Sequence, residues 1–121
     1  MIKKRAALPF SEHALQVTVC QYLAVAMKPG LHWCAIPNGG KRDMRTAVKL
    51  KREGVKAGTP DIVILLPEGR VAWLELKIKG GSLSVEQQAF RNICQRLGHH
   101  WAVAKTLDEA TAFLTAIGAV K

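Results

Sequence analysis

The fold is determined by residues 58–77, Gly58-Thr-Pro-Asp-Ile-Val-Ile-Leu-Leu-Pro-Glu-Gly-Arg-Val-Ala-Trp-Leu-Glu-Leu-Lys77. Two runs rich in Val, Ile, Leu and Trp, each as long as a β-strand, flank Pro-Glu-Gly at positions 67–69. This pattern predicts a β-hairpin, whose turn we expect to be of type I followed by a left-handed glycine. Counting back from that turn places Asp61 directly opposite Glu75, with Cβ atoms about 4.5–5.5 Å apart.

Three charged side chains converge at the open end of this predicted hairpin. Lys77 shares a face with Glu75, because side chains alternate along a strand. Like charges opposite each other destabilise a sheet, so Asp61 and Glu75 need a counter-charge, either Lys77 or a divalent cation. We expect their face to be the buried one, because its other members are Val63, Leu65, Val71 and Trp73. The alternative is an edge hairpin whose charges are merely solvated, and a register slip of one residue would remove the pairing.

Composition and length predict one domain over residues 1–121, with residues 1–8 as a loose basic arm. No apolar run is long enough to span a bilayer, and the N-terminus lacks the apolar segment of a signal peptide. The three cysteines, Cys20, Cys34 and Cys94, are far apart and form no Cys-x-x-Cys motif. They predict buried reduced thiols in a cytoplasmic protein rather than a zinc site.

The positive charge of the chain is unevenly distributed. The formal net charge is +9 at pH 7. Residues 1–56 contain eleven Lys or Arg and three Asp or Glu, whereas residues 57–121 contain seven and six. This asymmetry predicts a face that binds a polyanion. A surface that merely keeps the protein soluble would explain the positive net charge, but not its concentration in the first half of the chain.

The first predicted helix starts after Ser11, its N-cap, and has an apolar arc consisting of Leu15, Val19, Tyr22, Leu23 and Ala26. Glu12 and Gln16 fall inside that arc. We therefore expect Glu12 to point towards the core, where a carboxylate is costly unless it is paired or binds a metal. The alternative is that Glu12 only complements the helix dipole. A short strand is expected at residues 31–36.

Basic residues concentrate in the loop 37–42 and in a predicted helix over residues 43–53, capped by Asp43. The loop sequence Pro-Asn-Gly-Gly-Lys-Arg suits a phosphate, although it is also typical of an ordinary turn. In the helix we expect the inward-facing residues to be Met44, Ala47 and Val48. The cations that stack on one face, if the helix continues far enough, are Arg45, Lys49, Arg52 and Lys56. We interpret them as a track for a nucleic-acid backbone, and the alternative is a solvated face.

The sequence of the last third of the chain predicts a helix, then a strand, then a second helix. Ser84 and Gln87 form a capping box for a helix that ends before Gly98. Its core side is expected to consist of Phe90, Ile93, Cys94 and Leu97. A strand at residues 100–104 and a helix at about 107–117 follow. His99 and His100 are interpreted as structural, because no other ligand residues lie near them in the sequence.

Several of these motifs together resemble the VRR-NUC domain (virus-type replication-repair nuclease) of the PD-(D/E)XK nuclease superfamily, in its stand-alone phage and bacterial form. Pro60-Asp61 followed by Glu75-Leu76-Lys77 matches the superfamily motif. A lone motif of this kind is common by chance. The further matches occur in the order of the family, at residues 12–16, 37–42, 54–61 and 83–87, and span nearly the whole chain.

The resemblance implies an α/β fold with a restriction-endonuclease-like core, in which a mixed central sheet is flanked by helices. It implies a Mg²⁺- or Mn²⁺-dependent nuclease whose metal is held by Asp61, Glu75 and the Leu76 carbonyl, with support from Glu12. Lys77 would orient the attacking water, and Gln87 would be an accessory residue of the site. The residues expected to bind DNA are Gln16, Asn38, Lys41, Arg42, Arg45, Lys49, Arg52 and Lys56.

Family members of this type are similar to structure-specific DNA endonucleases, including Holliday-junction resolvases, that work as homodimers on branched DNA. The expected location is the cytoplasm of a bacterial or phage-infected cell, without membrane association. Two alternatives remain. A catalytically silent DNA-binding module of the same fold would not need Asp61, Glu75 and Lys77 together. An adaptor protein that binds acidic partners would not show the steep salt dependence of a phosphate-backbone binder.

Overall fold

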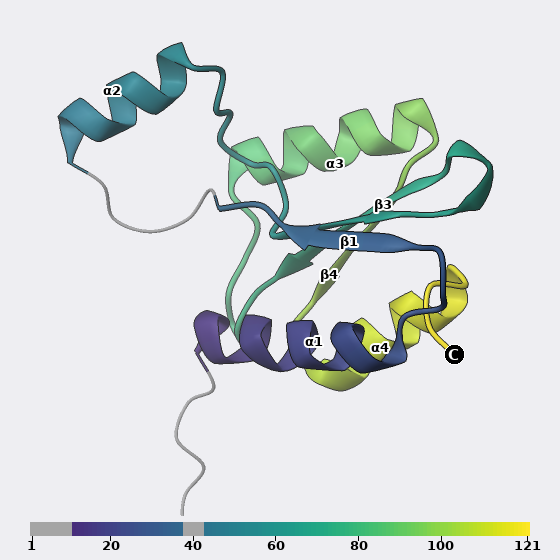
Figure 1. Ribbon diagram of the computed structural model, residues 1–121. Helices are drawn as coiled ribbons and strands as arrows, with labels where there is room; N and C mark the ends of the chain where they lie inside the picture. The colour runs from purple at the N-terminus through teal and green to yellow at the C-terminus, as the bar shows by residue number, and fades with distance from the viewer. Residues whose placement is uncertain (1–10, 38–42) are drawn as a thin grey trace, which may run out of the picture.

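The centre of the molecule is a four-stranded mixed sheet, seen in a computed structural model that describes residues 11–37 and 43–121 (Figure 1). The strands lie side by side in chain order: β1 (His32–Ala35), β2 (Ile62–Leu65), β3 (Val71–Leu76) and β4 (His100–Ala104). The β1–β2 and β2–β3 pairs are antiparallel, and β3 pairs with β4 in parallel. The predicted α/β class with a mixed central sheet is confirmed.

Helices cover both faces of this sheet, as Figure 1 shows. The bounds of the four helices are α1 (Glu12–Ala26), α2 (Met44–Arg52), α3 (Val85–Leu97) and α4 (Leu107–Ala116). Helices α1 and α4 pack against one face, and α3 connects β3 to β4 across the other. Helix α2 stands away from the sheet. Within the two described ranges, no helix has the length and apolar character needed to cross a membrane.

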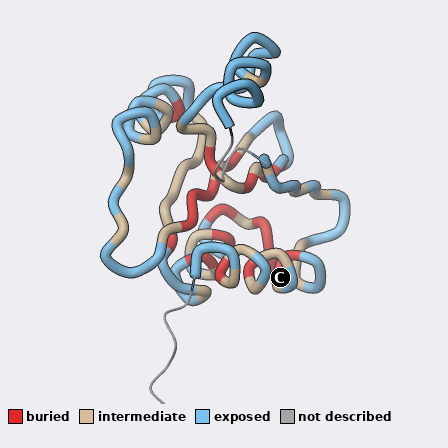
Figure 2. The backbone as a smooth tube through the Cα atoms, turned by 90° about the vertical axis from the view of Figure 1, so that its left-hand side faces the viewer, coloured by how far each residue is buried: buried red, intermediate tan, exposed pale blue. Residues whose placement is uncertain are grey.

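The main core lies between the sheet and the pair α1 and α4, and Figure 2 shows the buried backbone gathered there. Ile62, Ile64 and Leu74 point into it and are fully buried. Val63 and Trp73 point to the opposite face and are only half-buried, although Trp73 contacts Phe90 of α3. The expectation that the face of Val63 and Trp73 is the buried one was therefore wrong. Two helices cover the first face and one helix covers the second, and this difference sets the burial.

The hairpin of β2 and β3 has the predicted register. Ile62 pairs with Leu74 and Val63 pairs with Trp73, so the next position outward places Asp61 opposite Glu75. The turn itself differs from the prediction. Glu68, with a φ of 64°, is left-handed, as is the glycine that follows it. A type I turn requires a negative φ at the position of Glu68, so that turn type was wrong.

The helix ends follow the local sequence. The side chain of Ser11 accepts a hydrogen bond from the Ala14 amide, and Asp43 caps α2 in the same way. Ser84 and Gln87 form both hydrogen bonds of the predicted capping box. Gly98 ends α3 in the left-handed conformation, with a φ of 81°. These caps satisfy backbone amides that have no partner inside the helix.

One prediction about helix α2 was wrong, and the condition attached to another is not met. Met44, Ala47 and Val48 are all exposed, with 81% of the Met44 surface accessible, because α2 packs against neither face of the sheet. The helix also ends at Arg52, so Lys56 lies beyond it and does not continue the stack of cations.

Burial on α3 is narrower than its sequence predicted. Cys94 is buried and Phe90 is half-buried, whereas Ile93 and Leu97 are exposed. A single helix lying on an open sheet presents only a narrow stripe to it, so the outer apolar positions remain in solvent. Cys34 is also exposed, on the edge strand β1, contrary to the expectation of buried thiols.

Candidate active site

Asp61 is held at the end of the hairpin by its main chain and its side chain. Its carbonyl accepts a hydrogen bond of 2.8 Å from the amide of Ile36. Its Oδ2 accepts a hydrogen bond of 2.8 Å from the amide of Leu76, on the opposing strand. The carboxylate thus takes the place of a backbone acceptor in the β2–β3 ladder, and this contact directs it towards β3.

Glu75 is the buried charged residue of the described chain, with 4% of its surface accessible. Its Oε1 accepts a hydrogen bond of 3.1 Å from Nε2 of Gln87 on α3. The Oε1 of Gln87 accepts from the amide of Ser84 at 2.8 Å. Because the capping box occupies the amide oxygen, the amide nitrogen is the group presented to Glu75. The capping interpretation of Gln87 is therefore confirmed, and the same side chain also contacts Glu75.

The electrostatic environment favours a neutral Glu75. Burial, followed by the charge of nearby Asp61, raises the pKa of Glu75 to about 8, while the Lys77 ammonium acts in the opposite direction. A hydrogen bond with Asp61 and, as the smallest cause, the charge of Glu12 add to the increase. Without a further cation, the carboxylate pair therefore retains a proton at neutral pH. A bound cation would replace that proton.

These groups line one cavity of about 600 Å³, at the end of the sheet where α1, β1, β3 and α3 meet. The residues of the predicted site that line it are Glu12, Gln16, Asp61, Glu75, Leu76, Lys77 and Gln87. The cavity also includes His13, which is not among the predicted site residues. His13 follows Glu12 and precedes Gln16 by three positions, so its place on the same helix face was a signal available in the sequence.

Glu12 lies at the wall of this cavity, but its side chain is exposed instead of pointing into the core. In the described ranges no three side chains of the His, Cys, Asp and Glu types come together as a metal-binding group. The two carboxylates that do come together are those of Asp61 and Glu75. Two carboxylates with a backbone carbonyl and waters form the oxygen donor set that Mg²⁺ accepts, so the residues present fit such an ion.

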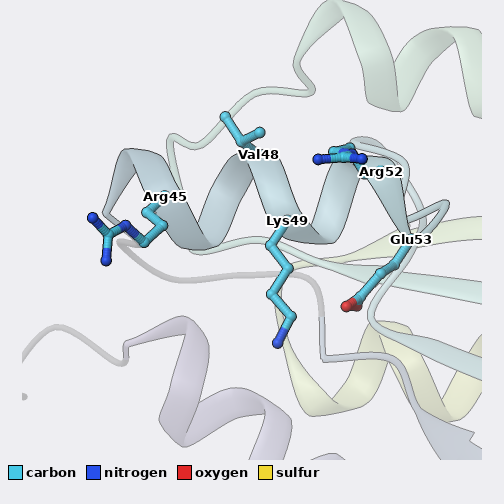
Figure 3. Close-up of a pocket in the computed structure, with 5 residues that line it drawn as sticks. All are labelled: Arg45, Val48, Lys49, Arg52 and Glu53. Atoms are coloured by element: carbon cyan, nitrogen blue, oxygen red, sulfur yellow. The ribbon is translucent and has the colours of Figure 1, made fainter.

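The basic residues of α2 form a separate surface. Arg45, Lys49 and Arg52 line a hollow of about 500 Å³ together with Val48 and Glu53. Figure 3 shows the three cations spread along the helix, with Glu53 at its C-terminal end. We call this surface the basic hollow. Lys56 lies outside it, in two other hollows. The predicted DNA contacts Asn38, Lys41 and Arg42 fall outside the described residues.

His99 has a structural contact. Nε1 of Trp73 donates a hydrogen bond of 2.9 Å to Nδ1 of His99, and the Trp73 ring meets Phe90 edge-on at 5.0 Å. The histidine therefore fixes the indole that lies under α3, two residues along β3 from Glu75. This contact agrees with the structural interpretation of His99.

The mixed sheet, the helices on both faces and the paired carboxylates at the end of the central hairpin define an α/β domain of the nuclease-like type. A family model described as the VRR-NUC domain matches residues 10–107. Since the match covers most of the chain, the protein belongs to the VRR-NUC domain family, a family of nucleases.

Solved structures support the fold assignment. The chain is similar to a structure described as a VRR-NUC domain protein, with a TM-score of 0.74 and 22% identity over 91% of this chain and 89% of that one. A second structure, described as a VRR-NUC domain, has a TM-score of 0.60 and 15% identity over 86% of this chain and 94% of that one. A search of curated proteins gave no match.

Proposed function

We propose that this protein is a divalent-metal-dependent DNA nuclease that hydrolyses phosphodiester bonds. The observation that carries the proposal is the pairing of Asp61 with Glu75 across the hairpin, in one cavity with Lys77 and Gln87. Placing a buried carboxylate beside a second one costs stability. A function that needs both, such as holding a cation, gives a reason for that cost.

The roles of the residues follow from their contacts. Asp61, Glu75 and the Leu76 carbonyl would hold Mg²⁺ or Mn²⁺, which when bound stabilises negative charge on a phosphate and acidifies a water. Gln87 holds the Glu75 carboxylate in place through its amide nitrogen. Lys77, on the wall of the same cavity, orients the attacking water and stabilises it as it loses its proton. Glu12 would support the site from α1.

The proposal extends to the substrate and the assembly. The cations of the basic hollow would contact phosphates of duplex DNA and steer it towards the cavity. We further propose that the enzyme is a structure-specific endonuclease that acts on branched or junction DNA as a homodimer in the cytoplasm. The support for this substrate and this assembly is the resemblance to stand-alone VRR-NUC nucleases.

A cleavage panel tests the proposal. The purified protein is incubated with a four-way junction, a flap, a duplex and a single strand, in Mg²⁺, Mn²⁺ or EDTA. We expect metal-dependent cleavage by the parent and none by Asp61→Asn or Glu75→Gln, both of which should still bind DNA. Asp108→Asn is the matched control, because this exposed carboxylate lies in the first turn of α4 and does not line the cavity.

The outcomes separate the proposal from its alternatives. Unimpaired cleavage by either site variant would exclude Asp61 and Glu75 as metal ligands. DNA binding by the parent without cleavage in either metal would indicate a silent DNA-binding module. A protein that binds no DNA at low salt would leave only the adaptor interpretation.

A further inference from the structure

A second groove, of about 460 Å³, lies beside the active-site cavity, between α1 and β1. One wall of the groove is a row of α1 residues that includes Val17, Cys20 and Ala24. This row lies next to the row of α1 residues that is buried in the core. The half-buried indole of Trp33 on β1 closes its side. This volume falls within the range of about 300–1,000 Å³ that is typical of ligand sites.

The groove and the active-site cavity are neighbours. His13 and Gln16 line both of them, so one side of each residue borders each space. A DNA strand whose scissile phosphate lies in the active-site cavity therefore has the groove beside it. The part of a nucleotide nearest to a phosphate, other than its sugar, is its own or the adjacent base.

The chemistry of the groove suits a base better than a phosphate. Within the described chain its lining includes no Lys, Arg, Asp or Glu, in contrast to the active-site cavity and the basic hollow. It offers the indole of Trp33, aliphatic side chains of α1, and the amides of Gln16 and Gln21. An indole stacks on any base, and an amide can both donate to and accept from a base edge. Trp33 also packs against the core, so its ring is held before any ligand arrives.

We propose that this groove binds an unpaired base of the DNA strand that is cut. The proposal rests on the proposed nuclease function and specifies its substrate, which is DNA with at least one unpaired nucleotide next to the cleaved bond. A fully paired duplex keeps its bases stacked inside the helix and leaves the groove empty. The groove thereby gives preference for unpaired structures without contacts to a particular base sequence.

The test compares two variants of neighbouring residues on α1. Ala24→Phe fills the groove from an exposed position, so the core is untouched. Val25→Phe adds a ring at a position that is 77% exposed and does not line the groove. Affinity is measured in EDTA, which prevents cleavage, for a duplex and for the same duplex with one unpaired nucleotide. We expect the parent and Val25→Phe to prefer the second DNA by roughly tenfold, and Ala24→Phe to lose that preference.

A second readout is the fluorescence of the protein. Stacking of a base on Trp33 should quench part of the emission when the DNA with the unpaired nucleotide binds. The quenching should persist in Trp101→Phe, whose indole lies outside the groove, and disappear in Trp33→Leu. Trp33→Leu must retain a cooperative thermal transition for this comparison, and Ala24→Phe supplies the same comparison with the indole in place.

Two results would overturn the proposal: equal affinity of the parent for both DNAs, or an unchanged preference in Ala24→Phe, whether or not the oligomeric state of that variant changes. An unchanged preference together with a changed oligomeric state would identify the groove as a surface for self-association. Failure of the nuclease function is distinguishable. In that case the parent would show the preference in EDTA but no cleavage with Mg²⁺ or Mn²⁺.

Discussion

Gly58 and Gly54 provide a sharp test of how the active site is built, because the same substitution has different consequences at the two positions. Both glycines are left-handed, with φ of 91° and 95°. A Cβ on Gly58 would lie 2.5 Å from the carbonyl carbon of Glu86, and closer still to its oxygen, whereas a Cβ on Gly54 would meet nothing within 4 Å. Both substitutions therefore place alanine in a strained left-handed conformation, and Gly58→Ala adds a collision with the backbone of α3.

The expected magnitudes follow from these two contributions. A left-handed conformation costs a non-glycine residue roughly 1–2 kcal/mol, and the reduced entropy of the unfolded chain offsets about 0.4–1 kcal/mol of that. Gly54→Ala should therefore lower the free energy of unfolding by about 1 kcal/mol. Forced overpacking adds roughly 1–3 kcal/mol, so Gly58→Ala should lower it by about 2–4 kcal/mol. For a domain of this size each kcal/mol corresponds to roughly 3–5 °C in Tm.

The collision also has a consequence for the site. The Cβ on Gly58 would lie 3.0 Å from the backbone nitrogen of Gln87, so the first turn of α3 must move away from it. That movement would draw the Gln87 amide away from Glu75. Gly58→Ala should therefore reduce cleavage at temperatures where it is still folded, whereas Gly54→Ala should not.

Thermal unfolding, followed by circular dichroism, measures the effect on stability. Single-turnover cleavage measures the effect on the site, at a temperature about 20 °C below the Tm of each variant, where each variant is folded. Equal decreases in Tm for the two variants would refute the close approach of residue 58 to α3. A larger decrease for Gly58→Ala with normal cleavage would refute the link between α3 and the site.

Three further predictions follow from the site. Because the pKa of Glu75 is raised from 4.5 to about 8, the folded state binds more protons than the unfolded state between these values. The metal-free protein should therefore be most stable below pH 4.5 with respect to this group and lose that contribution as pH rises to about 8; urea unfolding in EDTA should show a weaker decline for Glu75→Gln. Lys77→Ala should slow cleavage by roughly 100-fold or more, with little change in the metal affinity measured by calorimetry. Lys79→Ala is the control and should cleave as fast as the parent. Replacing the three cations of the basic hollow by alanine should flatten the slope of log affinity against log salt by about 2 to 3, and an unchanged slope would exclude them as phosphate contacts.

The pairing of Asp61 with Glu75 could be predicted because it depends on local rules. A short turn between two strands sets the register, and alternation of side chains then sets which residues share a face. The capping box of Ser84 and Gln87 was predictable for the same reason, since its partners are three residues apart. The turn type was not, because Glu68 adopts a left-handed conformation that is uncommon outside glycine.

The burial of the two faces could not be predicted, because it depends on how many helices cover each one. Both faces of the hairpin carry apolar side chains, so Ile62 and Val63 are indistinguishable by composition. Similarly, the apolar residues of α2 show that the helix could pack, but not that it has a partner in this chain. Met44 has none among the described residues that buries it.

The separation of α2 from the sheet divides the molecule into parts that can change independently. Asp61, Glu75, Lys77 and Gln87 all belong to one segment that runs from the residue before β2 to the first turn of α3. The cations of α2 belong to another segment, which contributes no buried side chain to the core. Substitutions there carry little structural penalty and leave the chemistry intact. In the nuclease that we propose, the strength of DNA binding can therefore be adjusted, by selection or by design, without rebuilding the proposed catalytic centre.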